Sequence, residues 1–549
     1  MQEEKLDNAR FDGIIIGAGH NGLIAAAYLA KAGLKVAVFE RRPNVGGAFT
    51  TEEVTAPGFK HNIHAVYLKI HDSPVHSDLQ LDRYGVSYIF PYVKQSFIKH
   101  DSYFIFYQNL EATYESLKRV SRKDAETFKK VARQWRQWYV DFLLPQMYSA
   151  PKPPDQWEEE VLKKPGGRQF RDVTLNYSPV EYAAELFESE YGRATVTRGA
   201  ISAEYDPTTK GIPTLVFATI VNWFAGNTAI VRGGTLRLPL ALAKIIEENG
   251  GKVFTGQAVG RIIVEGGVAK GISLKDGREI RADRFVVSGL DPVNTFLFMV
   301  GEDKLDHQTL ERLCEYKFNE TSLFRVHLAL KERPIFEISK KEPAVNDALM
   351  FTVGYENPGD LVNLVKQARS GMIPDVVGLT AENITSHDPS QAPPGCHTAY
   401  LGLAAPFDLA GGGGALWVDR AHETAEKLLA KYREYAPNIS DDKIIARFNY
   451  SPKDIEEYLP DLVSGDICQG KICPEQLDYN RPWPGASRFR TPIDRLYMCG
   501  ACTHPGGHAT GGPGYNAANA IAEDLGIAKW WPRYDPARIL HAQGHLSWM

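Results

Sequence analysis

The chain has 549 residues, 62 basic against 67 acidic side chains, a formal net charge of −5 and six cysteines. Charges mixed in this way give no support for nucleic-acid binding, and so few cysteines do not form a secreted disulfide framework. The N-terminus is polar and no run of eighteen apolar residues occurs, so we expect a cytoplasmic protein without a signal peptide or a membrane-spanning helix.

The segment 11–47 carries a nucleotide-binding fingerprint, FDGIIIGAGHNGLIAAAYLAKAGLKVAVFERRPNVGG. Its apolar run 13–16 predicts a buried strand, after which Gly17, Gly19 and Gly22 form GxGxxG. The first glycine permits a tight turn, the second lets the backbone approach a pyrophosphate, and the third lets helix and strand pack closely. The pattern therefore predicts a dinucleotide site.

A helix over 21–32, with Gly33 as its stop, and a second strand over 35–39 complete this unit. The N–H groups at the start of the helix would point at the phosphates. Glu40 ends the second strand, eighteen residues after Gly22. A carboxylate at that place accepts both hydrogen bonds of an adenosine ribose and repels a 2′-phosphate.

The continuation RRPNVGG favours flavin adenine dinucleotide (FAD) over NAD as the ligand. Beyond the acid it supplies Arg41, Arg42 and the glycine pair Gly46 and Gly47, the extended form seen in flavoproteins of the glutathione-reductase superfamily. We expect at least one of the two arginines to lie in a solvated turn.

A second nucleotide-domain block starts at Val231 and contains the pair Gly233 and Gly234. A helix over 238–249 and a short strand over 252–255 follow. Two-residue turns then predict a β-meander and a buried strand that returns to the parallel sheet, over 259–264, 268–274, 279–282 and 284–288.

The third block comprises a strand over 496–499, a glycine-rich loop over 500–514 and a helix over 515–525. Strand and helix bracket the loop closely, which argues against a merely mobile segment. In a flavoprotein of this design the loop passes the ribityl chain. The helix N-terminus then faces the flavin, where its partial positive charge stabilises the reduced ring.

The fold class indicated is α/β: a glutathione-reductase-type Rossmann FAD domain with a β-meander, interleaved with an α+β substrate domain. The length has room for three or four domain-sized units, yet the blocks favour two discontinuous domains. The FAD-binding domain would take 1–70, 231–293 and 491–549. The substrate-binding domain would take the aromatic-rich insertions 71–230 and 294–490.

Two cysteine pairs, Cys468 with Cys473 and Cys499 with Cys502, suit either a zinc site or a redox dithiol. The first spacing is wide, and the second pair lies in a predicted strand-to-loop turn. Disulfide reductases of the superfamily carry their redox pair shortly after the first glycine motif, whereas no cysteine here precedes Cys314. We therefore expect no metal, and electrons that leave the flavin by another route.

Taken together, the three blocks resemble the phytoene desaturase and carotenoid isomerase-related FAD flavoproteins. Within that family they are most similar to the branch named for pyridine nucleotide-disulfide oxidoreductase domain-containing protein 2. The specific marks are the fingerprint, VRGGTLRLPLALA from Val231, SGLDP from Ser288 and GACTHPGG from Gly500. HNIHA at 61–65 and the interrupting His508 depart from the family pattern and indicate a smaller or more polar substrate than a carotenoid.

The resemblance implies non-covalent FAD and hydride removal from a hydrophobic small molecule, and O2 or a quinone is the expected electron acceptor. It also implies backbone contacts from Val259 to adenine and a place for Gly500 and Ala501 beside the ribityl phosphate. The full set of expected cofactor contacts is Gly17, Gly19, His20, Asn21, Gly22, Glu40, Arg41, Arg42, Gly46, Gly47, Val259, Gly500, Ala501, Gly512 and Tyr515.

Formation of a double bond requires hydride transfer to the flavin and loss of a proton from the neighbouring atom, so a base or a water path should lie on the substrate side. His504 is the first choice, because the glycine-rich loop carries it toward the flavin edge. A structural hydrogen-bonding role suits it equally well. The other candidates are His64, His61, Glu204, Tyr205 and Tyr515.

One predicted helix, 129–144, carries an apolar stripe. Its members are Val131, Trp135, Trp138, Tyr139 and Phe142. The stripe suits a peripheral membrane contact. Packing on the domain core or across a dimer interface explains it as well, and we favour packing.

Two classes of function are open at this point. The first is an FAD-dependent dehydrogenase, desaturase or oxidase that forms a C=C or C=N bond in a hydrophobic small molecule, with an amine oxidase as a near variant. The second is a flavin-bound interaction protein with little turnover. The rate at which photoreduced flavin reoxidises in air separates the two classes, whereas fold analogy names no substrate.

Overall fold

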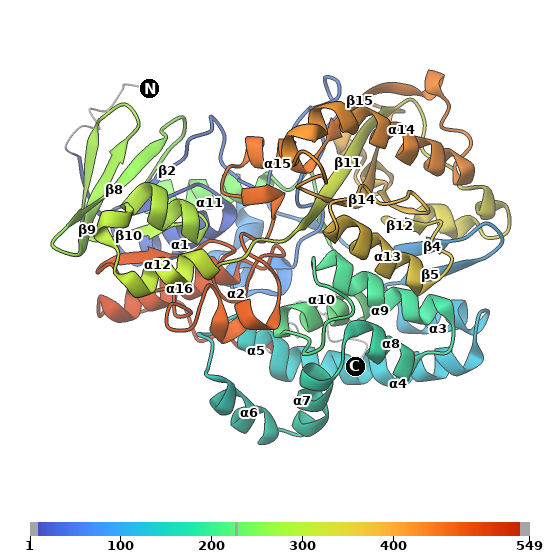
Figure 1. Ribbon diagram of the computed structural model, residues 1–549, viewed down its shortest axis with the longest axis horizontal. Coiled ribbons are helices and arrows are strands. Elements are labelled where there is room, and N and C mark those ends of the chain that lie inside the picture. The colour runs from blue at the N-terminus through green and yellow to red at the C-terminus, as the bar shows by residue number, and fades with distance from the viewer. Residues whose placement is uncertain (1–8, 226–228, 538–549) are drawn as a thin grey trace.

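The computed structural model describes residues 9–225 and 229–537, which form two large sheets and a layer of helices (Figure 1). The first sheet has the strand order β7-β2-β1-β10-β9-β8, and β16 pairs with β10. Its strands are β1 (Arg10–Ile16), β2 (Val36–Phe39), β7 (Lys252–Phe254), β8 (Val259–Glu265), β9 (Val268–Leu274), β10 (Glu279–Ser288) and β16 (Leu496–Met498). The predicted Rossmann strands and the meander therefore belong to one sheet.

Strand β10 joins the two parts of this sheet and corrects one prediction. We expected separate strands over 279–282 and 284–288, but a single strand spans both. Its first half pairs antiparallel with β9, and its second half pairs parallel with β1 and β16. Asp283, between the two predicted segments, is exposed where the strand passes from the meander into the buried parallel sheet.

Three helices cover the parallel part of the sheet: α1 (His20–Lys31), α11 (Arg237–Glu248) and α16 (Gly512–Asp524). Helix α1 packs against both of the others. Helix α16 starts three residues earlier than the predicted 515, because Gly511 adopts a φ of +70° as its N-cap and Pro513 occupies the first turn. The glycine-rich loop is correspondingly shorter.

The second sheet has the order β15-β11-β14-β13-β12-β4-β5. All its neighbours run antiparallel except β12 and β4. Strands β4 and β5 come from the first insertion and the others from the second. Their bounds are β4 (Val93–Ile98), β5 (Tyr103–Tyr107), β11 (Thr321–Leu330), β12 (Met350–Val353), β13 (Leu379–Glu382), β14 (His397–Pro406) and β15 (Ile444–Tyr450). A two-stranded pair, β3 (Tyr88–Ile89) with β6 (Ile230–Val231), lies outside both sheets.

Helices from the first insertion gather below the second sheet in Figure 1. They are α3 (Leu110–Lys118), α4 (Arg122–Trp138), α5 (Leu144–Met147), α6 (Pro154–Leu162), α7 (Gly167–Asn176), α8 (Pro179–Leu186), α9 (Glu190–Ser202) and α10 (Thr214–Ala225). The remaining helices are α2 (Pro74–Leu79), α12 (His307–Glu315), α13 (Pro358–Arg369), α14 (Trp417–Tyr435) and α15 (Pro452–Tyr458).

The apolar stripe expected on 129–144 packs on the protein's own core, so the packing alternative is confirmed. All five stripe residues are buried, and the Trp135 indole donates to the Tyr182 hydroxyl at 2.9 Å. The helix α4 begins earlier than predicted, because the Ser121 side chain caps it by accepting from the Asp124 N–H. Among the described residues, no helix combines the length and apolarity needed to cross a membrane.

Replacing Trp135 by alanine should lower the free energy of unfolding by about 3–5 kcal/mol, since it empties a fully buried indole site. Val418→Ala is the control, because Val418 is 83% exposed, and it should change the value by about 0.5 kcal/mol or less. Denaturant unfolding followed by circular dichroism measures both. Equal stabilities of the two variants would contradict the packing described here.

Candidate functional site

The glycine-rich turn between β1 and α1 has the geometry of a dinucleotide cradle. Gly17 has a φ of +91°, and a Cβ on Gly22 would lie only 2.4 Å from the Gly17 oxygen. A Cβ on Gly19, in contrast, would meet no atom within 4 Å. The Asn21 Oδ1 atom in the first turn of α1 is buried without a hydrogen-bond partner. The open space beside the N–H groups of the helix N-terminus suits a bound pyrophosphate group, whereas the Asn21 oxygen would need a hydrogen-bond donor.

Glu40 lies at the end of β2 and is directed toward this turn. Its two carboxylate oxygens accept from the Ala18 N–H and the Arg42 N–H, each at 2.9 Å. An ionised carboxylate has about four acceptor positions, so both oxygens can still accept from a ribose. The backbone of Glu40 also accepts from the Gln257 N–H at 2.7 Å, which brings the start of β8, and with it Val259, close to the same place.

The segment after Glu40 folds back over the turn. Gly46 donates to the Ala18 carbonyl at 2.9 Å, and a Cβ on Gly47 would lie 3.0 Å from the Gly19 Cα. His20 stacks on Phe49 with ring centroids 4.0 Å apart. The glycine pair thus forms the second wall of the cradle, where side chains would collide with the first.

The two predicted arginines differ in environment. Arg41 is exposed and donates to the Tyr458 carbonyl at 3.0 Å. Arg42 is half-buried, pairs with Glu52 at 3.0 Å and lies over the Tyr458 ring at 3.7 Å. Both therefore tie the turn to α15.

Two further strand ends meet the cradle. Gly289, after β10, donates to the Ile16 carbonyl at 2.9 Å. A Cβ on Gly500, after β16, would lie 2.7 Å from the Gly289 oxygen and 2.5 Å from Gln469 Oε1. Ala501 is half-buried, and its carbonyl accepts from Arg481 at 2.9 Å. The carboxyl ends of four parallel strands converge here, where open α/β sheets bind their ligands.

Helix α16 places its N-terminus beside that of α1. A Cβ on Gly514 would lie 2.3 Å from the Asn21 carbonyl, so the two helices are in contact at their first turns. Gly512, which we expected within the loop, is the first residue of α16. The partial positive charges of two helix N-termini are therefore directed at one crevice.

His61 and His64 lie where the Rossmann part contacts the second sheet. His61 Nε2 lies 2.8 Å from Thr55 Oγ1, and His64 Nε2 lies 3.2 Å from the Tyr450 hydroxyl. Arg325 of β11 donates to the Ile63 and His64 carbonyls at 2.6 and 2.7 Å. Burial lowers the pKa of His61 to about 4 and is the main cause that lowers the pKa of His64 to about 3. Both rings are neutral at neutral pH.

Glu204 belongs to a cluster of polar side chains that the sequence analysis did not predict to be neighbours. Its Oε2 accepts from Asn319 at 3.2 Å, while its Oε1 has no hydrogen-bond partner. Asp466 and Cys468 bring ligand-type atoms within 4.8 Å of the Glu204 carboxylate. Burial, followed by the charge of Asp466, raises the pKa of Glu204 well above its ordinary value. The neighbouring Tyr205 is buried, and its hydroxyl lies 3.3 Å from the backbone carbonyls of Lys210 and Gly211.

Sequence reasoning missed two residues as site candidates, His508 and Lys69. His508 Nε2 lies 3.5 Å from Cys468 Sγ. Lys69 is buried, donates to Thr219 Oγ1 at 3.1 Å, and has its pKa lowered to about 7 by burial. Both flank Ala509 of the glycine-rich loop, whose carbonyl accepts from the Lys69 N–H. Lys69 is the one charged residue in the run VYLKI, and this pattern could have identified Lys69 as a candidate.

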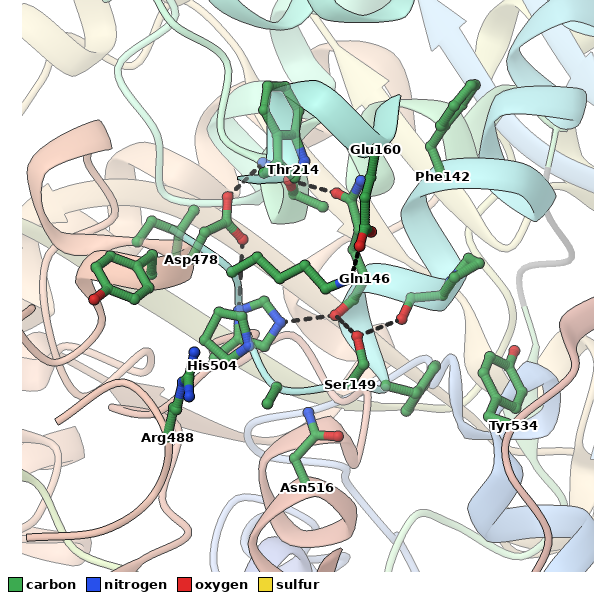
Figure 2. Close-up of a pocket in the computed structure, with 18 of the residues that line it drawn as sticks. Phe142, Gln146, Ser149, Glu160, Thr214, Asp478, Arg488, His504, Asn516 and Tyr534 are labelled. Atoms are coloured by element: carbon green, nitrogen blue, oxygen red, sulfur yellow. Dashed lines mark hydrogen bonds and ion pairs between the residues drawn. The ribbon is translucent and has the colours of Figure 1, made fainter. Parts of the chain in front are cut away.

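His504 turns toward a large cavity, about 770 Å³ in volume, which Figure 2 shows. Its Nε2 lies 2.8 Å from the Gln146 carbonyl and its Nδ1 lies 3.6 Å from Asp478 Oδ1. Tyr515 lines the same cavity and packs on Tyr28 with ring centroids 5.4 Å apart. His508 does not line it. These contacts direct the His504 ring toward Gln146 and Asp478. The expected placement of His504 at the flavin edge stays a prediction.

The cysteines of both predicted pairs are free thiols that form no disulfide bond. Cys499 and Cys502 are fully buried, and burial raises the pKa of Cys499 to about 12. Thiols in that state are inert nucleophiles.

Comparison with known proteins places the whole chain among oxidoreductases. A model described as an NAD(P)-binding Rossmann-like domain matches residues 15–80. The chain is 34% identical to a polypeptide of the limonene dehydrogenase of Castellaniella defragrans, over 97% of this chain and 98% of that protein. It is 29% identical to the mouse pyridine nucleotide-disulfide oxidoreductase domain-containing protein 2, over 94% of each. A lycopene-forming phytoene desaturase from Paracoccus is 27% identical over 56% of each.

Among solved structures, an oxidoreductase from Methanosarcina mazei superposes with a TM-score of 0.57 at 18% identity, over 93% of this chain and 99% of that one. A likeness at this identity shows the fold alone. It confirms the predicted α/β class.

His61→Gln should reduce the acid sensitivity of the fold. Below pH 6.5 the unfolded chain protonates His61, whereas the folded chain keeps it neutral down to about pH 4. This difference in protonation lowers the free energy of unfolding. The loss increases as the pH falls through that window and reaches about 2 kcal/mol at pH 5. Between pH 7 and pH 5 the parent should therefore lose more free energy of unfolding than the variant, by about 2 kcal/mol. Denaturant unfolding at the two pH values measures both losses.

The matched control is His307→Gln, since the His307 side chain is 88% exposed. An unchanged difference between pH 7 and pH 5 in the His61 variant would show that His61 is not buried as described.

Proposed function

The chain belongs to the family of FAD-dependent oxidoreductases related to phytoene desaturases, and from this membership we propose that it removes a hydride and a proton from a hydrophobic small molecule to form a C=C or C=N bond. The observation that carries the proposal is the crevice in which four strand ends and two helix N-termini meet. A relative named for limonene supports an apolar substrate.

FAD would bind with its pyrophosphate over Gly19 and its adenosine ribose on Glu40. The open space at Gly19 and the free acceptor positions of Glu40 support this placement. Gly46 and Gly47 would close the crevice from the other side. Bound FAD supplies the two-electron acceptor, and the chain supplies the field of two helix N-termini, which stabilises negative charge.

We also propose that the two sheets have different roles, one in binding the cofactor and the other in binding the substrate. The first sheet and its helices, within 1–70, 231–293 and 491–549, would hold the cofactor. The second sheet with the helical layer, within 71–230 and 294–490, would enclose the substrate. The buried contacts of Arg325 with the Ile63 and His64 carbonyls support a fixed junction between the two parts.

Glu204 is the residue we propose as the base. Its Oε1 has no partner, and Asn319 fixes the other oxygen, so the free oxygen is held ready to accept a proton. The raised pKa makes the ionised carboxylate a stronger base than an ordinary glutamate. The cluster of Cys468 and His508 beside it offers a polar route for the proton. The electron acceptor is O2 or a quinone.

Gly19→Val should give a folded protein without FAD. No atom lies within 4 Å of the new Cβ, so the chain keeps its fold while the side chain fills the space of the pyrophosphate. The visible absorbance of purified protein measures flavin occupancy, and circular dichroism measures the fold. Full occupancy in this variant would place the cofactor elsewhere.

Glu204→Gln should keep FAD but slow flavin reduction by substrate about 10²- to 10⁴-fold, the usual contribution of a positioned base. In the parent, the rate should rise as the pH rises through the pKa of Glu204, because only the ionised form accepts a proton. The variant should lose that rise. Anaerobic stopped-flow absorbance gives both results.

Glu185→Gln serves as the matched control, since Glu185 is an exposed carboxylate on the neighbouring helix α8. A Glu204 variant that reduces its flavin at the parent rate would return attention to His504, His61 and His64.

A further inference from the structure

The 770 Å³ cavity beside α16 lies within the size range of small-molecule sites. It is formed by α5, α6, the segment before α10, the segment around Asp478, and residues 529–534 after α16. Ala501, His508 and Ala509 of the glycine-rich loop do not line it, whereas His504 from the same loop does. The cavity therefore lies on a different side of that loop from the polar group around Glu204.

The cavity has an apolar wall and a polar end. Phe142, Trp157, Trp531 and Tyr534 contribute aromatic surface. In Figure 2 Asp478, His504 and Arg488 lie together on one side, and Phe142 and Tyr534 lie on the opposite side. An apolar body with one polar group is the ligand shape that such a distribution suits.

Two acceptor atoms at the polar end, one from His504 and one from Asp478, face each other with no donor between them. His504 Nε2 contacts the Gln146 carbonyl at 2.8 Å, and because a carbonyl only accepts, Nε2 carries the hydrogen. Burial, only partly offset by Asp478, lowers the pKa of His504, so its Nδ1 is an acceptor at neutral pH. That Nδ1 faces Asp478 Oδ1 at 3.6 Å, and neither atom has a hydrogen-bond partner.

Asp478 has further acceptor positions to offer. Its Oδ2 accepts from the Thr214 N–H at 3.2 Å, which leaves most of the carboxylate's four or so acceptor positions unfilled. The side chain is 33% exposed, and it lines the cavity. The exposed guanidinium of Arg488 lines the same end. A hydroxyl group can donate to the carboxylate and accept from the guanidinium at once.

We propose that this cavity is a second ligand site, separate from the cofactor crevice, which binds an apolar ring-sized molecule through a hydroxyl group that donates to Asp478. The same chemistry would suit a hydroxylated substrate and a hydroquinone, the reduced form of a quinone acceptor.

The test compares two probes in equilibrium dialysis with the FAD-loaded protein. The first is 2-naphthol, and the second is 2-methoxynaphthalene, which keeps the oxygen but has no donor. The parent should bind 2-naphthol at least tenfold more tightly, since a hydrogen bond to a charged acceptor carries that much preference. Equal binding of the two probes would overturn the proposal.

Asp478→Asn should reduce the preference for 2-naphthol at least fivefold. Asparagine tolerates the left-handed φ of +52° at this position, and its amide oxygen can still accept from Thr214. Glu160→Gln is the matched control, because Glu160 lines the cavity but is paired with Lys152, and it should leave the preference unchanged. A full preference in the Asp478 variant would overturn the proposal.

Ser149→Trp locates the probes independently of Asp478. Ser149 is exposed and lines the cavity, so the indole would fill the space without disturbing the core, and both probes should lose binding. Binding that survives this change would place the probes elsewhere and overturn the proposal. The flavin absorbance of every variant reports the cofactor crevice separately, so a failure here is distinct from a failure of the proposed function.

Reoxidation of the photoreduced protein by 1,4-naphthoquinone then assigns the source of the ligand. If 2-naphthol slows reoxidation, the cavity binds the quinone acceptor. If 2-naphthol leaves reoxidation unchanged, the cavity binds a hydroxylated substrate.

Discussion

At the end of β1 the backbone turns so closely that a side chain on Gly22 would lie 2.4 Å from the Gly17 oxygen. This contact sets the position of α1 on the sheet, and α1 in turn sets that of α16, because Gly514 packs directly on the Asn21 carbonyl. Two helix N-termini consequently face one crevice. An anion bound there gains from both, without any basic side chain in the turn itself.

Hydrogen bonds between strand ends and side chains complete this crevice. Glu40 is held by two backbone N–H groups, so the loss of entropy on ordering that carboxylate occurs during folding rather than during binding. Gln469 connects the ends of β10 and β16 through Gly289 and Cys502. The four strand ends are thus fixed relative to one another before any ligand enters.

Several buried polar groups of the protein have pKa values far from their ordinary ones. His61 and His64 are neutral, Lys69 has its pKa lowered to about 7, and Glu204 has its pKa raised. Burial is the main cause in each case, since the charged form loses its water. Groups held away from their preferred charge state in this way are typical of sites that move protons. The two buried histidines make the fold sensitive to acid, because they take up protons more readily in the unfolded chain.

The sequence by itself determined most of the cofactor crevice: the first strand, the glycines, Glu40 and, to within one residue, the start of α1 follow from local turn geometry and short-range periodicity. It placed the start of α16 three residues too late. It did not determine the second sheet, because β4 pairs with β12 across more than two hundred residues of chain, and no local pattern encodes such a partner. It also did not determine that β10 is continuous, since the two halves of that strand pair with different neighbours, β9 and β1. The grouping of Glu204 with Cys468 and His508, and the direction of the His504 ring into a separate cavity, were decided by tertiary structure alone. Each depends on contacts between segments distant in sequence, whose side chains become neighbours only when the two sheets pack together.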